Sequence, residues 1–162
     1  IIAEDLGVIT EDVITLRNNF SLPGMKILQF AFDGNTNNPY LPKNIKGNNW
    51  VVYTGTHDNS TTFSWWENLE QDKRLEIDQS YGSSYNPPWN IIEIGMRTNA
   101  NLFIAPIQDI LSLDNSCRLN TPGTIENNWK WKMRNMSDSL ICSLEKYGKL
   151  GGIYSRINKN FS

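Results

Sequence analysis

The sequence predicts an α/β fold, in which parallel strands alternate with helices. Short apolar runs that end in Gly, Pro or Asn recur along the chain and indicate buried strands. Between these runs, apolar residues recur at the spacing of one helix face. The 162 residues, of which 39% are hydrophobic and 20% are charged, are enough for one globular unit with an ordinary core.

The first strand is expected at residues 1–6, an apolar run that stops at a glycine. A helix is expected next, because Thr10 precedes two acidic residues that suit the positive end of a helix dipole. Its apolar residues recur at helical spacing and are Val13, Leu16 and Phe20.

The second strand is expected at residues 25–32 and the third at residues 50–54. Residues 33–49 between them are rich in Asn, Pro and Gly, which predicts a long surface loop. After the third strand, Asn59 is expected to cap a helix, and residues 71–79 continue as helix.

The last third of the chain begins with the helix-start signal Asn-Pro-Pro, which predicts a helix over residues 89–96. Residues 102–113 begin as a fourth apolar strand and pass into loop or helix. A closing helix is expected at residues 137–147, capped by Ser137. Its inward-facing residues are expected to be Leu140, Ile141 and Leu144.

Two architectures fit four parallel strands without edge protection: half of a (β/α)₈ barrel, or a small open doubly wound sheet. The doubly wound sheet has less support, because no strand ends in the GxGxxG or GxxxxGK[ST] pattern that binds a nucleotide.

Charge and cysteine content exclude several function classes. A net charge of −2 gives no electrostatic footprint for nucleic acid or for an anionic membrane. No apolar run approaches the roughly 20 residues that span a bilayer. Cys117 and Cys142 accompany a single histidine, so two reduced thiols are expected rather than a zinc site, and no metal site is predicted.

Polar side chains fall at the end of every expected strand, where the chemistry of such barrels gathers. In chain order these are Glu4 and Asp5, Gln29 and Asp33, His57 and Asp58, and Gln108 and Asp109. Paired carboxylates suit glycosidic bond chemistry, in which one donates a proton and another stabilises positive charge on the sugar ring.

Specific roles follow from side-chain length and chemistry. Glu4 suits the general acid, Asp58 suits charge stabilisation, and a neutral His57 can hydrogen-bond a sugar hydroxyl. Six Trp and six Tyr suit a carbohydrate ligand, whose faces are apolar and whose edges carry hydroxyls, but core and interface packing is the alternative explanation. A Glu-Asp pair at a strand end is also a common turn or helix cap, so the residues alone leave both readings open.

Five sequence blocks, in order, resemble the 4-alpha-glucanotransferases, also called amylomaltases or disproportionating enzymes. The blocks are AEDLG (3–7), LPGMKILQFAF (22–32), NPYLP (38–42), VVYTGTHDN with TT and WW after it (51–66), and RLNTPGT with NW and W after it (118–131). The order and spacing extend across nearly the whole chain.

The resemblance implies the C-terminal half of a (β/α)₈ barrel, about strands five to eight, with residues 1–162 as the C-terminal part of a single catalytic domain whose N-terminal half is missing. It implies transfer of α-1,4-glucan segments between maltooligosaccharides or to glucose, by a retaining double displacement without a cofactor. No nucleic-acid or membrane partner is implied, and the expected location is the cytoplasm, or the plastid stroma in a plant.

Residue by residue, the resemblance assigns Glu4 to the general acid/base and Asp58 to the carboxylate that stabilises the transition state. His57 matches the histidine that binds the donor sugar, and Asn120 and Phe30 match positions that line the glucan site. The family's nucleophile is an aspartate on an earlier strand, and no residue here matches it. The chain alone is therefore expected to be inactive and, with an uncovered core, prone to aggregate.

Two alternatives remain beside the transferase. An α-amylase-type glycoside hydrolase shares a strand-end His-Asp pair and an acidic Glu. A non-catalytic glucan-binding remnant is consistent with the unmatched nucleophile.

Overall fold

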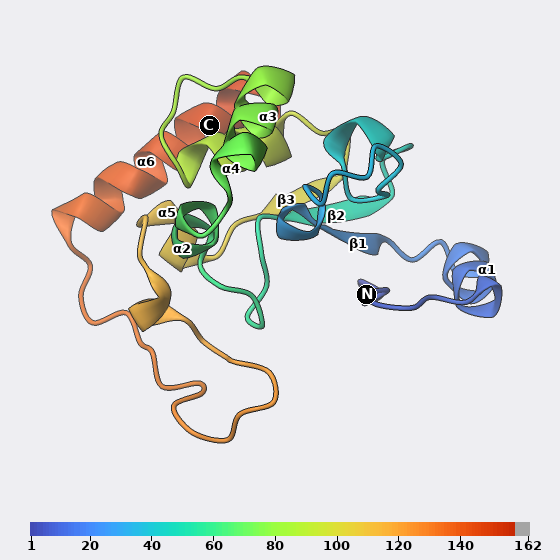
Figure 1. Cartoon of the computed structure of the whole chain (residues 1–162), viewed down its shortest axis with the longest axis horizontal. Coiled ribbons are helices and arrows are strands. Elements are labelled where there is room, and N and C mark those ends of the chain that lie inside the picture. Colours follow the sequence, from blue (N-terminus) through green and yellow to red (C-terminus); the bar gives the residue numbers. More distant parts are fainter. Residues whose placement is uncertain (158–162) are drawn as a thin grey trace.

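The computed structural model describes residues 1–157 and has an α/β fold (Figure 1). Its parallel sheet has the order β1-β2-β3, with the strands β1 (Gly24–Ile27), β2 (Trp50–Tyr53) and β3 (Leu102–Ile104). The helices are α1 (Glu11–Asn19), α2 (Thr62–Glu67), α3 (Gln71–Tyr81), α4 (Trp89–Met96), α5 (Ile107–Ile110) and α6 (Asp138–Ile153). Short 3₁₀ turns are η1 (Leu28–Phe30), η2 (Pro42–Asn44) and η3 (Asn115–Cys117).

The main core lies on one face of the sheet, beneath the helices. Val52 of β2 pairs in register with Phe103 of β3, and both pack in a cluster that includes Ile91 of α4 and Leu150 of α6. Gly95 allows the close approach of α4, because a Cβ at this position would lie 2.1 to 2.8 Å from the Phe103 ring. In Figure 1, α3, α4 and α6 gather on one side, while α1 stands apart at the opposite end.

The other face of the sheet is open. Side chains alternate between faces along a strand, so Met25, Tyr53 and Ile104 point away from the helical core. All three line a large cavity. The sheet therefore supplies an apolar floor for the polar residues that follow its strands.

Residues 1–6 form no strand, although the sequence predicts one there. The segment does run beside β1, where the Ala3 amide donates to the Pro23 carbonyl over 2.9 Å. The next rung is made by a side chain, because the Met25 amide donates to Asp5 Oδ1 over 2.7 Å. One backbone rung does not make a ladder, so the prediction of a strand is wrong in this respect.

Two neighbouring predictions also need correction. The second strand ends at Ile27 rather than at residue 32, because the chain turns into η1 there. Thr61, not Asn59, caps α2, and its side chain accepts from the Ser64 amide. Asn59 instead closes the preceding turn, where its Oδ1 accepts from the Thr56 amide over 2.8 Å.

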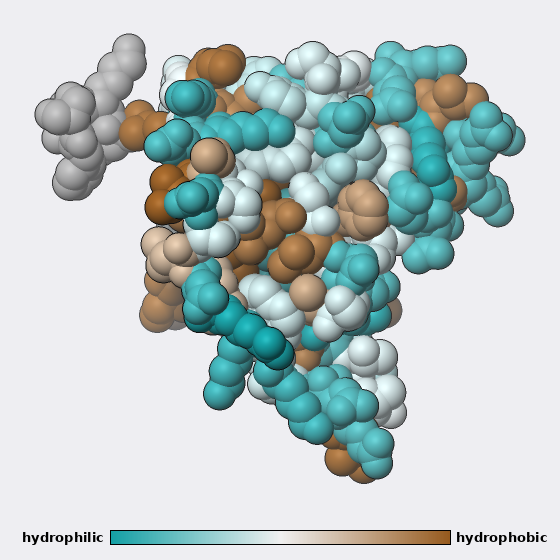
Figure 2. All heavy atoms as spheres, turned by 90° about the vertical axis from the view of Figure 1, so that its left-hand side faces the viewer, coloured by the Kyte–Doolittle hydropathy of each residue, from teal (hydrophilic) through white to brown (hydrophobic). Residues whose placement is uncertain are grey.

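The closing helix is confirmed, with Ser137 as its cap, but its inward face is displaced. Leu140 and Leu150 are buried, whereas Ile141 and Leu144 remain 45% and 41% exposed. The buried face of α6 runs along residues 140, 147 and 150. It therefore includes Tyr147, which stacks on Phe103. Figure 2 shows the side of the molecule on the left of Figure 1, where apolar surface appears among polar side chains.

The other predicted elements agree with the structure. Helices were predicted where α1, α3 and α4 lie, and a strand was predicted where β2 lies. The fourth predicted strand passes into a helix, as expected, since β3 is followed by α5. The helical spacing in α1 is not matched by burial, because Val13, Leu16 and Phe20 are exposed. Half of a (β/α)₈ barrel remains a prediction, since three strands do not define a barrel.

Candidate active site

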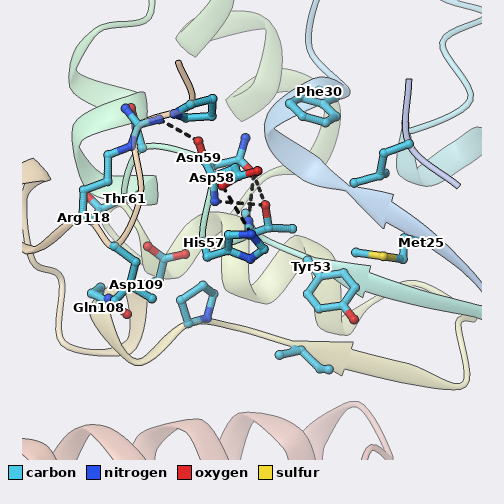
Figure 3. Close-up of a pocket in the computed structure, with 18 of the residues that line it drawn as sticks. Met25, Phe30, Tyr53, His57, Asp58, Asn59, Thr61, Gln108, Asp109 and Arg118 are labelled. Atoms are coloured by element: carbon cyan, nitrogen blue, oxygen red, sulfur yellow. Dashed lines mark hydrogen bonds and ion pairs between the residues drawn. The ribbon is translucent and has the colours of Figure 1, made fainter. Parts of the chain in front are cut away.

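A cavity of about 1060 Å³ lies over the carboxyl ends of β2 and β3 (Figure 3). Its walls come from residues 2–7, the 55–61 turn after β2, the residues after β3, and the loop that begins at Arg118. Glu4, Phe30, His57 and Asp58, all selected from the sequence, line it. Small-molecule sites typically enclose about 300 to 1,000 Å³, so this cavity is at the upper end of that range.

The His57–Asp58 turn forms one wall. His57 Nε2 lies 3.3 Å from Asp58 Oδ1, and both side chains are 48% exposed, so they face the open cavity rather than the core. Asn120, which is distant in sequence, donates from Nδ2 to the same Asp58 oxygen over 2.5 Å. Among residues 1–157, Asp58 Oδ2 has no hydrogen-bond partner, which leaves it available to a ligand hydroxyl.

The Arg118 side chain binds backbone carbonyls of the same turn and of the neighbouring loop. Its Nη2 donates to the Asp58 carbonyl over 2.6 Å, and its Nε donates to the Asn120 carbonyl over 2.8 Å. The Asn120 amide in turn donates to the His57 carbonyl over 3.1 Å. The sequence contains Arg118 in a matched block but gave no reason to single it out, because its function depends on a contact 60 residues away.

Trp129 covers His57 from the same loop. The two ring centroids lie 5.0 Å apart with an interplanar angle of 39°, and the indole is 60% exposed. Its backbone is in the left-handed region, with φ of 59°, and its amide donates to the Leu119 carbonyl over 2.6 Å. The indole therefore extends the aromatic surface beside the polar pair.

Asp109 supports the turn from beneath. Its carboxylate accepts from Thr54 Oγ1 over 2.5 Å, from the Thr62 amide over 2.7 Å and from Thr62 Oγ1 over 2.6 Å. Thr54 directly follows β2 and Thr62 begins α2, so one buried side chain ties together both ends of the segment that carries His57 and Asp58. Burial raises the pKa of Asp109, although the hydrogen bonds from Thr54 and Thr62 act in the opposite direction.

Not every strand-end residue reaches the cavity. Gln108 and Asp109 line it, but Asp5, Gln29 and Asp33 do not. Gln29 Nε2 donates to the Ser60 carbonyl and to Thr62 Oγ1, so it supports the turn after β2. The exposed Asp33 accepts from the Asn35 amide over 2.9 Å, which lowers its pKa and closes a surface turn. The expectation that all of them converge is therefore wrong for these three.

Glu4 and Phe30 form the wall near β1. Phe30, in η1, is 43% exposed and packs edge-on against Tyr40 with the centroids 5.6 Å apart. Glu4 is exposed in the extended N-terminal segment. Asn120 does not itself line the cavity; it reaches the site through Asp58.

Within residues 1–157, no three His, Cys, Asp or Glu side chains cluster in a way that could hold a metal ion, and Cys117 and Cys142 are free thiols. In the same part of the chain, none of the helices combines the length and apolar character that a bilayer crossing requires.

The fold and the site define a class: an α/β protein whose carboxylate, amide and aromatic side chains meet at the carboxyl ends of parallel strands. The chain belongs to the 4-alpha-glucanotransferase family, whose model matches residues 1–138.

Relatives with assigned names support this membership. The chain is 43% identical over 161 residues to the chloroplastic/amyloplastic 4-alpha-glucanotransferase of Oryza sativa subsp. japonica. The aligned region covers 97% of this chain and 27% of the relative. It is 47% identical over 134 residues to the 4-alpha-glucanotransferase of Synechocystis. That alignment covers 82% of this chain and 26% of the relative. The chain thus spans about a quarter of the length of these proteins.

The amylomaltase of Streptococcus agalactiae, solved in complex with acarbose, has a similar structure. Its TM-score is 0.86 at 31% identity, over 97% of this chain and 32% of that one. The fold of this chain is therefore similar to that of part of this amylomaltase.

Proposed function

We propose that residues 1–162 supply part of the active site of a 4-alpha-glucanotransferase, which transfers α-1,4-glucan segments between maltooligosaccharides or to glucose. The single observation that carries the proposal is one cavity lined by Glu4 on one wall and by the His57–Asp58 turn on another. A general acid and a charge-stabilising carboxylate around one ligand-sized space are two of the three carboxyl groups that the proposed reaction uses.

Glu4 acts as the general acid/base in this proposal. In the first step an aspartate from outside the 162 residues attacks the anomeric carbon, and Glu4 protonates the departing glycosidic oxygen. In the second step Glu4 removes the proton from an acceptor 4-hydroxyl, which displaces the aspartate and restores the enzyme. The exposure of Glu4 in the cavity is consistent with contact to both the donor and the acceptor.

Asp58 stabilises the positive charge that develops on the sugar ring. Asn120 and His57 both lie against its Oδ1, which fixes the carboxylate and leaves Oδ2 toward the cavity. A carboxylate oriented before the reaction costs no reorganisation in the transition state. His57 and Phe30 contribute sugar contacts through hydrogen bonding and an apolar face, respectively.

The rest of the fold is proposed to be a (β/α)₈ barrel, with residues 1–162 forming about strands five to eight of one catalytic domain. The open inner face of the sheet and the exposed apolar side of α1 support this, since both have the character of surfaces that other elements cover. A plastid location follows only from the names of the plant relatives, and a cytoplasmic one is the alternative.

The test uses a family-length chimera, in which residues 1–157 of this chain replace their counterpart in the rice relative. Glu4→Gln and Asp58→Asn should each reduce glucose release from maltotriose by roughly 10² to 10⁴-fold. Glu11→Gln and Asp12→Asn, the same changes at exposed positions on α1, should leave the rate unchanged. Near-normal rates for Glu4→Gln or Asp58→Asn would remove the corresponding assignment.

Two further outcomes separate the alternatives. A transferase lengthens some maltotriose chains, whereas an α-amylase-type hydrolase only shortens them, so the product distribution of the chimera decides between these reactions. If the chimera binds maltoheptaose but neither lengthens nor shortens it, the non-catalytic glucan-binding alternative is supported.

A further inference from the structure

Residues 2–6 alternate in direction although they form no strand. Ile2, Glu4 and Leu6 line the cavity, whereas Ala3 and Asp5 between them do not, and the Asp5 side chain contacts the Met25 amide of β1 and Arg17 of α1. Alternation with a period of two is a property of extended backbone. The direction of Glu4 is therefore set by whatever fixes its neighbours on the opposite side.

We propose that Asp5, held by Arg17, is a positioning residue that keeps Glu4 directed into the cavity. This inference rests on the proposed function of Glu4. Asp5 was present in a block that matches the family, but neither the sequence nor the resemblance gave it a step.

Both oxygens of Asp5 are engaged on the side away from the cavity. Oδ1 accepts from the Met25 amide over 2.7 Å, and Oδ2 forms an ion pair with Arg17 Nη1. The two side chains are only 8% and 14% exposed, so the pair is largely shielded from water. Loss of one partner from a shielded ion pair leaves an uncompensated charge, which is far costlier than loss of a surface pair.

The residues around the Asp5–Arg17 ion pair are packed closely against it. A Cβ at Gly24 would overlap Asp5 Oδ2, and it would lie 2.7 Å from both Arg17 Nη1 and the Trp50 ring. Two cations lie over the Trp50 ring: the Arg17 guanidinium is 4.6 Å from the ring centroid, and the Lys26 ammonium is 4.2 Å from the same point. Arg17 is thus fixed by an aromatic face as well as by the Asp5 carboxylate.

The ion pair between Asp5 and Arg17 is important for positioning because few other contacts hold residues 1–6 and α1 in place. Helix α1 buries none of its own residues within the described structure, and residues 1–6 share only the rung from Ala3 to Pro23 with the backbone of β1. Asp5 supplies the second rung. A slip by one residue in an extended segment turns every side chain to the opposite face, so Glu4 would leave the cavity.

Asp5→Asn and Arg17→Met test the proposal in the chimera described above, with Asp12→Asn on α1 as the matched control. Asn keeps an acceptor for the Met25 amide but loses the charge that Arg17 requires. We expect each variant to lower kcat on maltotriose by about 10 to 100-fold with KM within about 2-fold, because a displaced catalytic group costs this much. Arg17→Lys, which keeps the charge, should recover part of the loss.

A second substrate distinguishes positioning from general damage. In α-maltotriosyl fluoride the C1–F bond breaks with its electron pair leaving as fluoride, so the first step needs no proton from Glu4. The first-turnover release of fluoride should therefore fall much less than maltotriose cleavage in Asp5→Asn, Arg17→Met and Glu4→Gln alike. Because the ratio of the two rates within one variant does not depend on how much protein is folded, poor folding cannot imitate this result.

The outcomes also separate the inference from the proposed function. If Glu4→Gln cleaves maltotriose normally, the acid/base assignment itself fails. If Glu4→Gln shows the selective loss while Asp5→Asn and Arg17→Met lose both substrates equally, or neither, Asp5 has no positioning role and the inference is overturned.

Discussion

Asn120 Nδ2 lies 2.5 Å from Asp58 Oδ1, although 62 residues separate the two in the chain. The contact links the turn after β2 to the loop after η3, and it occupies one oxygen of a carboxylate that is otherwise open to the cavity. An amide is suited to this position, because it donates a hydrogen bond without adding charge.

Asn120→Asp should therefore harm the chimera more than Asn120→Ala. Two carboxylates at this separation repel, so Asp58 is displaced from the position that Asn120 holds. We expect the maltotriose rate of Asn120→Asp to fall at least about tenfold at pH 7. Asn127→Asp, the same change elsewhere in the loop, is the control. Equal rates for Asn120→Asp and Asn120→Ala would contradict the charge argument.

Trp129→Ala should weaken glucan binding while leaving the chemical step nearly intact. The indole covers His57 and presents an exposed aromatic face beside the polar pair, and an aromatic contact of this kind contributes about 0.5 to 1.5 kcal/mol. Titration calorimetry of the chimera with maltoheptaose should show Kd raised about 2 to 12-fold. Trp131→Ala serves as the comparison, and an equal effect there would argue against a specific platform at Trp129.

The stability of the chain should depend on pH through Asp109. Its folded-state pKa is raised by burial, so the folded protein holds this proton more tightly than the unfolded chain does. The resulting stabilisation is complete below the ordinary carboxyl pKa of about 3.9 and is lost as the pH rises through the raised value. Urea unfolding of wild type and Asp109→Asn across this window should show a fall with pH that the variant lacks. A parallel fall in both proteins would place its origin elsewhere.

Polar substitutions on α1 should cost the 162-residue chain little. Leu16 and Phe20 are 59% and 68% exposed, so Leu16→Gln with Phe20→Gln should reduce aggregation, measured by light scattering, without lowering the midpoint of unfolding. Leu140→Gln, at a buried position, should lower that midpoint strongly. In the family-length chimera the double variant should become destabilising, because the proposed barrel would cover this face. No difference between the two contexts would count against the barrel.

Periodicity and turn residues were sufficient for most of the fold. The alternation of strands and helices, the range of α4 after its two prolines, and the cap at Ser137 were all accessible from local chemistry. The irregular backbone of residues 1–6 was not, because an apolar run shows that a segment suits a sheet but not whether a neighbouring backbone completes the ladder. The inward face of α6 was misplaced for a similar reason, since burial depends on where Phe103 and Tyr147 meet.

The candidate site divides in the same way. His57, Asp58 and Glu4 follow apolar runs, so a rule about strand ends could find them and the structure places them around one cavity. Arg118 and Trp129 act through contacts with residues far away in sequence, which no spacing rule anticipates. Asp5 and Asp109 look like further catalytic carboxylates in the sequence. Only their partners, Arg17 and the two threonines, show that the oxygens of both carboxylates are bound by supporting residues.

The loop that carries Asn120 and Trp129 is closed at its base. The Trp129 amide donates to the Leu119 carbonyl, and the Thr121 amide donates to Asn128 Oδ1 over 2.9 Å. Residues 125–126 beyond these bonds are exposed and reach neither His57 nor Asp58. This tip is therefore a place where a fluorophore or a short peptide tag can be inserted beside the cavity, reporting on its occupancy without altering the residues that line it.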